Sequence, residues 1–291
     1  MTFVKVIIAY LLYFLLAAAL FLVVLFPDQA VTAYLDARLA AFDPSLSLLA
    51  ETIRPTLPPG IKMTGVDLIR ANVRLARFDD ARMSPDLATL LQAKKQVRLE
   101  ARLAGGSLNG LAVLTGTEPG GPLQAQADLF EIHLDQLEAI KANTRFSLSG
   151  SLNGRITHDG SRASEGGGTT NGSLAVSELH ITLKAPYFGI GEIVMVQTNA
   201  EFSVSGGNLR LKSLAFDGPM LEGKITGTID LRNPIEQSRL NLTGNAKPKP
   251  ELIARLQETI PQGAVNTRTL GTRGLTFRVR GSIDSPDVSM R

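Results

Sequence analysis

Few side chains in this sequence are of the types that perform catalysis or bind metals. The 291 residues include no Cys, which excludes disulfides, thiolate metal ligands and a Cys nucleophile. The histidines are His133, His158 and His180, and none has a partner at metal-ligand spacing. His133 and His180 fall within alternating apolar and polar residues, which predicts exposed strand positions. His158 falls in or beside a polar loop.

Asp79 and Asp80 form the one adjacent carboxylate pair, between Arg77 and Arg82. Without a cleft or other catalytic residue types, this pair favours a turn with local ion pairs over acid–base chemistry. The segment 189–191 (Gly-Ile-Gly) matches only a fragment of a nucleotide-binding glycine pattern and predicts a turn between strands. The sequence has no Gly-x-Ser-x-Gly elbow and no phosphate-binding loop of the Walker type. We therefore expect no enzyme, with no catalytic residue, no metal and no cofactor.

The overall charge argues against nucleic acid as a partner. Lys and Arg number 30 against 27 Asp and Glu, aromatic residues make up 5%, and Trp is absent. Nucleic-acid binding usually requires a clustered basic face and often aromatic stacking platforms. Arginines gather near the C-terminus but are diluted by Asp284 and Asp287, so we interpret them as a solvated strand face, with a basic contact surface as the alternative. These arginines are Arg268, Arg273, Arg278, Arg280 and Arg291.

An uninterrupted apolar run from residue 6 to 26 predicts a transmembrane anchor. At 1.5 Å per residue the run spans about 31 Å, the thickness of the hydrocarbon core of a bilayer. Lys5 before the run and Asp28 after it place residues 1–5 in the cytoplasm and the chain beyond the run across the membrane. The alternative is a signal peptide cleaved near 17–19, which would leave an apolar new N-terminus in water.

Residues 27–57 are predicted to form a helix and a linker. Val31, Leu35 and Leu39 follow helical spacing over 28–42, and Pro44 ends the pattern. Two interpretations stay open. The helix either lies on the bilayer or docks against a partner, or it is the first helix of the domain and packs on its own sheet.

Beyond Pro58-Pro59-Gly60 the apolar period changes to two, which is typical of antiparallel strands with one buried and one polar face. We expect a mainly β fold, coiled or groove-like, with a first half at 58–157 and a second at 174–291. A flexible loop at 158–173, rich in Gly, Ser and Thr, is expected to separate the halves. Glycine-containing strand units recur at 148–154, 221–227 and 279–283, which predicts a sheet that grows by repeated addition.

Three segments depart from the strand pattern. Residues 84–94 predict a helix that begins at Ser84, residues 129–140 a strand followed by a helical turn, and residues 250–260 a helix. Hairpin turns are predicted at Gly206-Gly207-Asn208 and at Asn153-Gly154.

The order of these features resembles the GspN family of bacterial type II secretion, in its deltaproteobacterial form. The resemblance rests on the anchor and helix, on 58–68 (PPGIKMTGVDL), on 83–95 (MSPDLATLLQAKK) and on the glycine-rich strand pair at 103–114. The closing segment 277–286 (FRVRGSIDSP) is also similar to the ends of AsmA-like and LptC-like sheets, which form a coiled β-groove.

The GspN resemblance implies an inner-membrane-anchored, periplasmic interaction component of the type II secretion machinery, with other inner-membrane subunits or the outer-membrane secretin as partners. The AsmA-like and LptC-like resemblance implies a β-groove that binds or conducts lipid between the inner and outer membranes. The two hypotheses differ in what fills the groove. If the helices at 84–94 and 250–260 fill it, the domain is a scaffold, and if they lie outside, a lipid channel is open.

Overall fold

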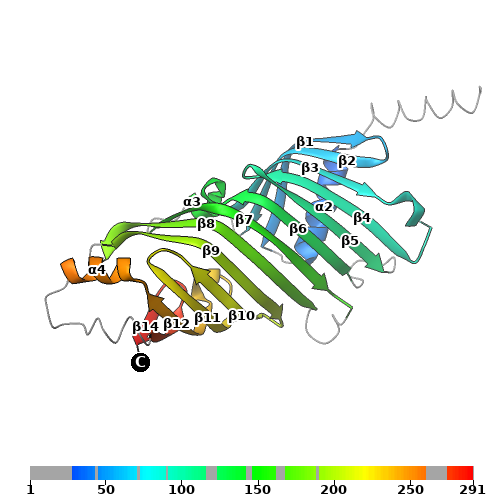
Figure 1. Ribbon diagram of the computed structural model, residues 1–291. Helices are drawn as coiled ribbons and strands as arrows, with labels where there is room; N and C mark the ends of the chain where they lie inside the picture. Colours follow the sequence, from blue (N-terminus) through cyan, green and yellow to red (C-terminus); the bar gives the residue numbers. More distant parts are fainter. Residues whose placement is uncertain are drawn as a thin grey trace, which may run out of the picture.

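The fold is one large antiparallel β-sheet with a few short helices (Figure 1). The computed structural model describes residues 28–42, 45–70, 73–89, 91–115, 123–141, 146–161, 168–187, 190–259 and 274–290. Its fourteen strands lie side by side in sequence order, so each strand pairs with the strands before and after it. β1 and β14 form the two open edges. The mainly β fold expected from the alternating pattern is confirmed.

The strands are long, and most are joined by short connections. They are β1 (Leu46–Thr56), β2 (Gly60–Arg70), β3 (Val73–Pro85), β4 (Lys94–Leu103), β5 (Gly106–Thr115), β6 (Leu123–His133), β7 (Phe146–Asp159), β8 (Thr169–Tyr187), β9 (Ile190–Ser205), β10 (Asn208–Asp217), β11 (Leu221–Asp230), β12 (Arg239–Pro248), β13 (Leu275–Ser282) and β14 (Pro286–Met290). The helices are α2 (Asp28–Phe42), α3 (Glu138–Lys141) and α4 (Pro250–Thr259), with 3₁₀ turns η1 (Leu87–Thr89), η2 (Leu134–Gln136) and η4 (Ile235–Gln237).

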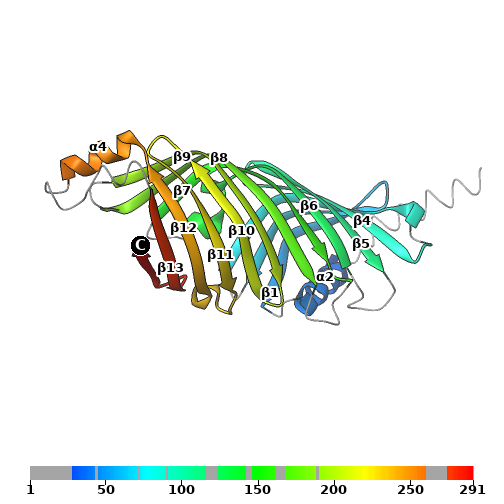
Figure 2. The same ribbon diagram turned by 60° about the horizontal axis from the view of Figure 1, so that its bottom comes forward.

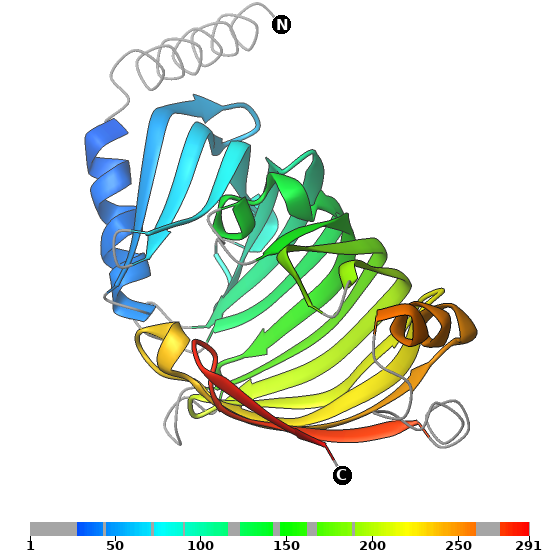
Figure 3. The same cartoon turned by 90° about the vertical axis from the view of Figure 1, so that its left-hand side faces the viewer.

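Helix α2 packs on its own sheet, which decides between the two interpretations of this segment. Val31 and Leu35 contact the buried cluster on β1 to β4, and the side chain of Asp36 accepts a hydrogen bond from the backbone N–H of Leu48 on β1 at 2.8 Å. The buried cluster consists of Ile53, Met63, Val66, Ala81 and Ala101. Figure 3 shows α2 on the side toward which the sheet bends, so α2 covers the concave face at the β1 end.

Several sequence predictions are confirmed. The strand and helical turn expected at 129–140 correspond to the end of β6, η2 and α3. The helix expected at 250–260 is α4, which follows β12 and lies at the other end of the sheet from α2 (Figure 2). Gly206 and Gly207 form the turn between β9 and β10, and both take positive φ (56° and 75°), a conformation that favours glycine.

Other predictions are wrong in detail because strand pairing overrides local turn and helix signals. Ser84 and Pro85 belong to β3, and the expected helix at 84–94 is reduced to the 3₁₀ turn η1. The carboxyl of Asp86 accepts a hydrogen bond from the backbone N–H of Ala88 at 3.1 Å and stabilises that turn. Asn153-Gly154 is not a hairpin turn but lies within β7, paired with Ala175 and Leu174 of β8.

The linker expected up to residue 57 is instead the edge strand β1. The loop expected at 158–173 is shorter, because β7 continues to Asp159 and β8 begins at Thr169. The pairing Gly154↔Leu174 joins the two expected halves directly, so the described strands form one continuous sheet.

No helix among the described residues is long and apolar enough to cross a membrane. The anchor predicted at 6–26 lies outside the part of the chain that the structure describes.

Candidate functional site

The most distinctive surface of this protein is a set of apolar rows that run across the sheet. Residues paired on neighbouring antiparallel strands point to the same face, and residues two apart on one strand share that face. Following the pairing register from strand to strand therefore shows which side chains form a row. Two rows cross all fourteen strands without a single polar side chain. We call the surface they form the apolar face and the opposite surface the charged face.

The first row passes beneath α2 and continues to the β14 edge. Its members are Ile53, Met63, Ala81, Ala101, Leu108, Leu129, Gly154, Leu174, Ala200, Leu214, Ile225, Gly244, Phe277 and Met290. The second row lies two residues away on most strands. Its members are Pro55, Ile61, Met83, Leu99, Gly110, Ala127, Ile156, Gly172, Phe202, Leu211, Gly227, Leu242, Val279 and Val288.

Among the residues that the structure describes, most of the apolar face has no second layer of structure over it. The first four members of row one are buried, and these lie in the cluster that α2 contacts. From Leu108 onward the other non-glycine members of row one are only partly buried or exposed. At the β14 edge Val288 and Met290 are 55% and 71% exposed. In the described part of the chain, an apolar surface of this length without covering structure is unusual for a protein in water, and large exposed apolar patches are typical of interaction surfaces.

A third row is interrupted by one polar pair. It comprises Pro85, Val97, Ala112, Ala125, His158, Thr170, Val204, Leu209, Ile229, Leu240, Gly281 and Pro286. His158 Nδ1 lies 2.9 Å from Thr170 Oγ1, so the pair hydrogen-bonds across β7 and β8. Among the described residues this is the one polar pair in the row.

The charged face carries paired ions between neighbouring strands. One row there reads Arg54, Lys62, Arg82, Glu100, Asn109, Asp128, Arg155, Ser173, Glu201 and Ser213. Arg155 donates a hydrogen bond to Asp128, and this bond, with a second from Gln126, holds the pKa of the Asp128 carboxyl below its ordinary value. The same bond raises the pKa of Arg155.

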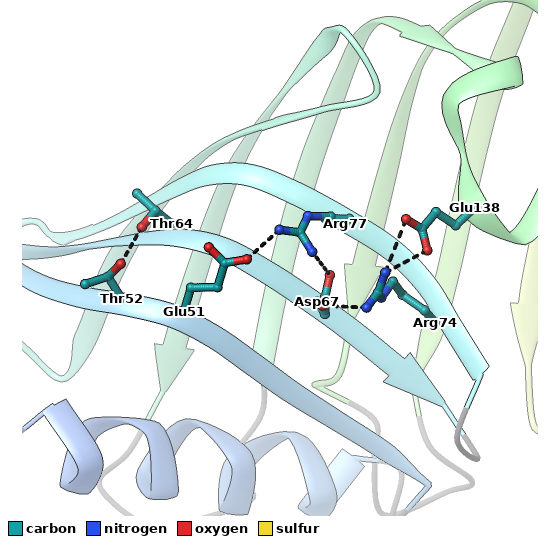
Figure 4. Close-up of polar contacts among 7 residues, drawn as sticks. All are labelled: Glu51, Thr52, Thr64, Asp67, Arg74, Arg77 and Glu138. Atoms are coloured by element: carbon teal, nitrogen blue, oxygen red, sulfur yellow. Dashed lines mark hydrogen bonds and ion pairs between the residues drawn. The ribbon is translucent and has the colours of Figure 1, made fainter.

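A five-residue network ties the first three strands to α3 (Figure 4). Arg77 contacts Glu51 at 2.5 Å and Asp67 at 3.6 Å, and Arg74 contacts Asp67 and Glu138 at 3.1 Å each. The hydrogen bond to Glu51, followed by the charge of Asp67, raises the pKa of Arg77. Figure 4 shows the network on the side of the sheet opposite α2, so it stabilises this end of the sheet from the charged face.

The residues that could have done acid–base or metal chemistry are dispersed. Asp79 and Asp80 lie within β3 rather than in a turn, and Asp80 accepts hydrogen bonds from Arg102 of β4. His133 is the exposed last residue of β6, and His180 on β8 lies 2.9 Å from Glu192. Both strand positions agree with the prediction, and His158 is the next-to-last residue of β7, beside the loop as expected. No group of three metal-binding side chains occurs among the described residues.

The fold and this surface define a class, a single open antiparallel sheet with one apolar and one charged face. Comparison with protein-family models, curated proteins and solved structures found no match to the chain. The register pattern and the exposure of the apolar face therefore carry the functional argument.

Proposed function

We propose that this protein binds the acyl chains of lipids along its apolar face, as an anchored β-groove protein that holds or conducts lipid between the inner and outer membranes. The single observation that supports the proposal is the pair of apolar rows that continue without a polar side chain from beneath α2 to the β14 edge. A polar residue in either row would force a bound hydrocarbon chain to desolvate it, which is costly without a compensating hydrogen bond.

The dimensions of the uncovered part suit lipid chains. Ten strands, β5 to β14, lie beyond the cluster contacted by α2, and their nine spacings of about 4.8 Å give roughly 43 Å. The chains of one bilayer leaflet extend about 15 Å, half of a hydrocarbon core of about 30 Å. The uncovered rows can therefore accommodate more than one chain end to end.

The placement of the helices agrees with a groove that is open over most of its length. The expected helix at 84–94 is only a turn between β3 and β4, and α4 continues from the end of β12 at the far end of the sheet (Figure 2). Helix α2 closes the β1 end instead. Protein partners are a poorer fit, because ordinary protein interfaces are about as polar as the rest of a protein surface.

The test compares lysines on the two faces of the same strands. Leu174→Lys with Leu214→Lys places charges in row one, whereas Ser173→Lys with Ser213→Lys places them one residue away on the charged face. The full chain is purified from membranes in mild detergent, and co-purified lipid is quantified by mass spectrometry. We expect a loss of lipid of about fivefold or more for the Leu pair only, because a buried charge opposes chain binding. Equal lipid in both variants and wild type, with matching circular dichroism, contradicts the proposal.

The second candidate is the interaction component of the type II secretion machinery, anchored in the inner membrane with its sheet in the periplasm. Its structural support is that β1 and β14 are open edges, which allow a partner subunit to add a strand. Deletion and complementation of the gene separate the candidates. Loss of exoproteins from the medium with normal detergent resistance favours secretion, whereas a detergent-sensitive outer membrane with normal secretion favours lipid binding. Neither role requires a catalytic residue.

A further inference from the structure

A cleft of about 740 Å³ lies on the charged face, across β11, β12 and β13 near the open end of the sheet. It is bounded by the segment that connects β11 to β12. The lining residues are Thr228, Asp230, Arg232, Gln237, Arg239, Leu240, Asn241, Arg280, Gly281 and Ser282. Leu240 and Gly281 are also members of the third row, so the cleft and that row lie on opposite faces of the same strands.

The wall of this cleft is held in place by Ser238, whose exposure is 0%. The backbone N–H of Arg232 donates a hydrogen bond to Ser238 Oγ at 3.0 Å, and the backbone N–H of Ile283 donates to the Ser238 carbonyl at 3.2 Å. A third bond joins the Asp284 N–H to the Glu236 carbonyl at 3.1 Å. The connection is thereby fastened to the turn between β13 and β14. A ligand entering the cleft meets a largely preformed surface.

The cleft lining contains three arginines and one carboxylate, Asp230, which lies opposite Arg239 in the register of β11 and β12. Asp230 forms an ion pair with Arg232 at 3.3 Å, but Arg239 and Arg280 have no ion pair or hydrogen-bond partner among the described residues. Asp287 lies opposite Arg280 in the register of β13 and β14, yet the two side chains form no salt bridge.

Some arginines elsewhere on the charged face are paired across strands. Arg77, Arg102 and Arg155 each contact a carboxylate of a neighbouring strand. Arg54, Arg82, Arg210 and Arg278 on this face, like Arg239 and Arg280, have no ion pair or hydrogen-bond partner among the described residues. What distinguishes Arg239 and Arg280 is that both line one cleft with a hydrogen-bonded wall.

We propose that this cleft binds a phosphate group, with Arg239 and Arg280 as its cationic ligands. Guanidinium groups match phosphate oxygens through paired N–H donors and stay charged at any physiological pH. Gln237, Asn241, Thr228 and Ser282 supply amide and hydroxyl groups around the arginines. The cleft lies on the face opposite the apolar rows, so the argument for the phosphate site depends on the cleft alone. A lipid headgroup and a soluble phosphate compound are the two sources of the phosphate that the experiment distinguishes.

Three probes measure the site and identify the source of the phosphate. Isothermal titration of the full chain in detergent uses inorganic phosphate, dihexanoyl phosphatidic acid and dihexanoyl glycerol, the last of which has the chains without the phosphate. The variant is Arg239→Gln with Arg280→Gln. The matched control is Arg54→Gln with Lys62→Gln, which removes two cations from paired positions on β1 and β2 of the same face.

We expect wild type and the control to bind phosphatidic acid about 10-fold or more tightly than dihexanoyl glycerol, as two charge-assisted contacts require. The R239Q/R280Q variant should lose this preference and still bind dihexanoyl glycerol. Equal preference in all three proteins overturns the site.

The other arms separate the two proposals. If neither lipid binds wild type but inorganic phosphate binds and R239Q/R280Q abolishes it, the site stands with a soluble phosphate compound as its ligand and the lipid proposal fails. If both lipids bind equally and phosphate does not bind, the lipid proposal stands and the phosphate site fails.

Discussion

The ring of Phe202 on β9 lies directly over Gly172 on β8, its paired residue in the second apolar row. A Cβ atom at Gly172 would overlap three atoms of the ring. Phe277 lies over Gly244 and Phe216 over Gly223 in the same way, each on a neighbouring strand. Glycine here provides the close approach that lets an aromatic ring lie flat against the sheet and cover the backbone beside it.

Replacing Gly172 with alanine should destabilise the protein by about 1–3 kcal/mol, since the added methyl group must displace the ring. Urea unfolding followed by circular dichroism measures the change. The double variant Gly172→Ala with Phe202→Leu removes the overlap and should be less destabilised than the sum of the single changes. Strictly additive effects would show that the ring does not lie on the glycine in solution.

Truncating Leu35 to alanine should weaken the contact between α2 and the buried cluster on β1 to β4. Because Leu35 is partly buried against this cluster, we expect a loss of about 1–2 kcal/mol. Tyr34, the adjacent residue, is 58% exposed, and Tyr34→Ala serves as the control with a much smaller effect. Equal unfolding midpoints for both variants would contradict the docking of α2 on the sheet.

The ion pair between Asp128 and Arg155 predicts an acid-dependent contribution to stability. The folded pKa of Asp128 is below its ordinary value of 3.8, so its contribution is present above that pH and is lost as the pH falls through the folded pKa. Wild type should exceed Asp128→Asn by no more than about 1 kcal/mol at pH 7, because Arg155 is largely exposed.

The measurement is urea unfolding of wild type and Asp128→Asn at several pH values between 7 and about 2.5. The two free energies of unfolding should converge at the acid end. Arg155→Gln, which removes the partner, should converge with wild type over the same range. A difference that stays constant down to the lowest pH would mean that the carboxylate charge contributes nothing.

Replacing Ser238 with alanine should loosen the wall of the arginine-lined cleft. The change leaves the N–H of Arg232 without its acceptor, at a cost of about 1–3 kcal/mol. Hydrogen exchange of the segment 231–238 should become faster, while exchange in β1 to β4 should not change. Ser213→Ala, a half-buried serine on β10, is the control. Unchanged exchange at 231–238 would show that Ser238 does not hold this segment.

The β content of this protein was predictable because alternation is a local property. Leu209 and Leu211, which alternate with the polar Asn208, Arg210 and Lys212, indicate a strand without knowledge of any neighbouring strand. The turn at Gly206-Gly207 was predictable for the same reason, since both residues take a backbone conformation that favours glycine.

Pairing across strands was not predictable from those local signals. Asp79-Asp80 and Asn153-Gly154 are typical turn sequences, but the hydrogen bonds to strands on both sides keep them extended within β3 and β7. The preference of a turn residue is of the order of 1 kcal/mol or less, which a continuous ladder on two sides outweighs. The alternation of apolar and polar residues is the sequence signal that indicates an apolar face. It does not specify the register between strands, so it does not show which residues lie side by side.

By itself the sequence determined that one face of nearly every strand is apolar and that catalytic residue types are scarce. Only the tertiary structure decided that these apolar residues line up as uninterrupted rows, that α2 covers one end and that Arg239 and Arg280 line one cleft. The physical reason is that register depends on bulges, such as the one between Leu211 and Leu214, and shifts by one residue would move every side chain to the other face. The register of each strand depends on its pairing with the strands on both sides at once. The sequence of a single segment does not contain this information.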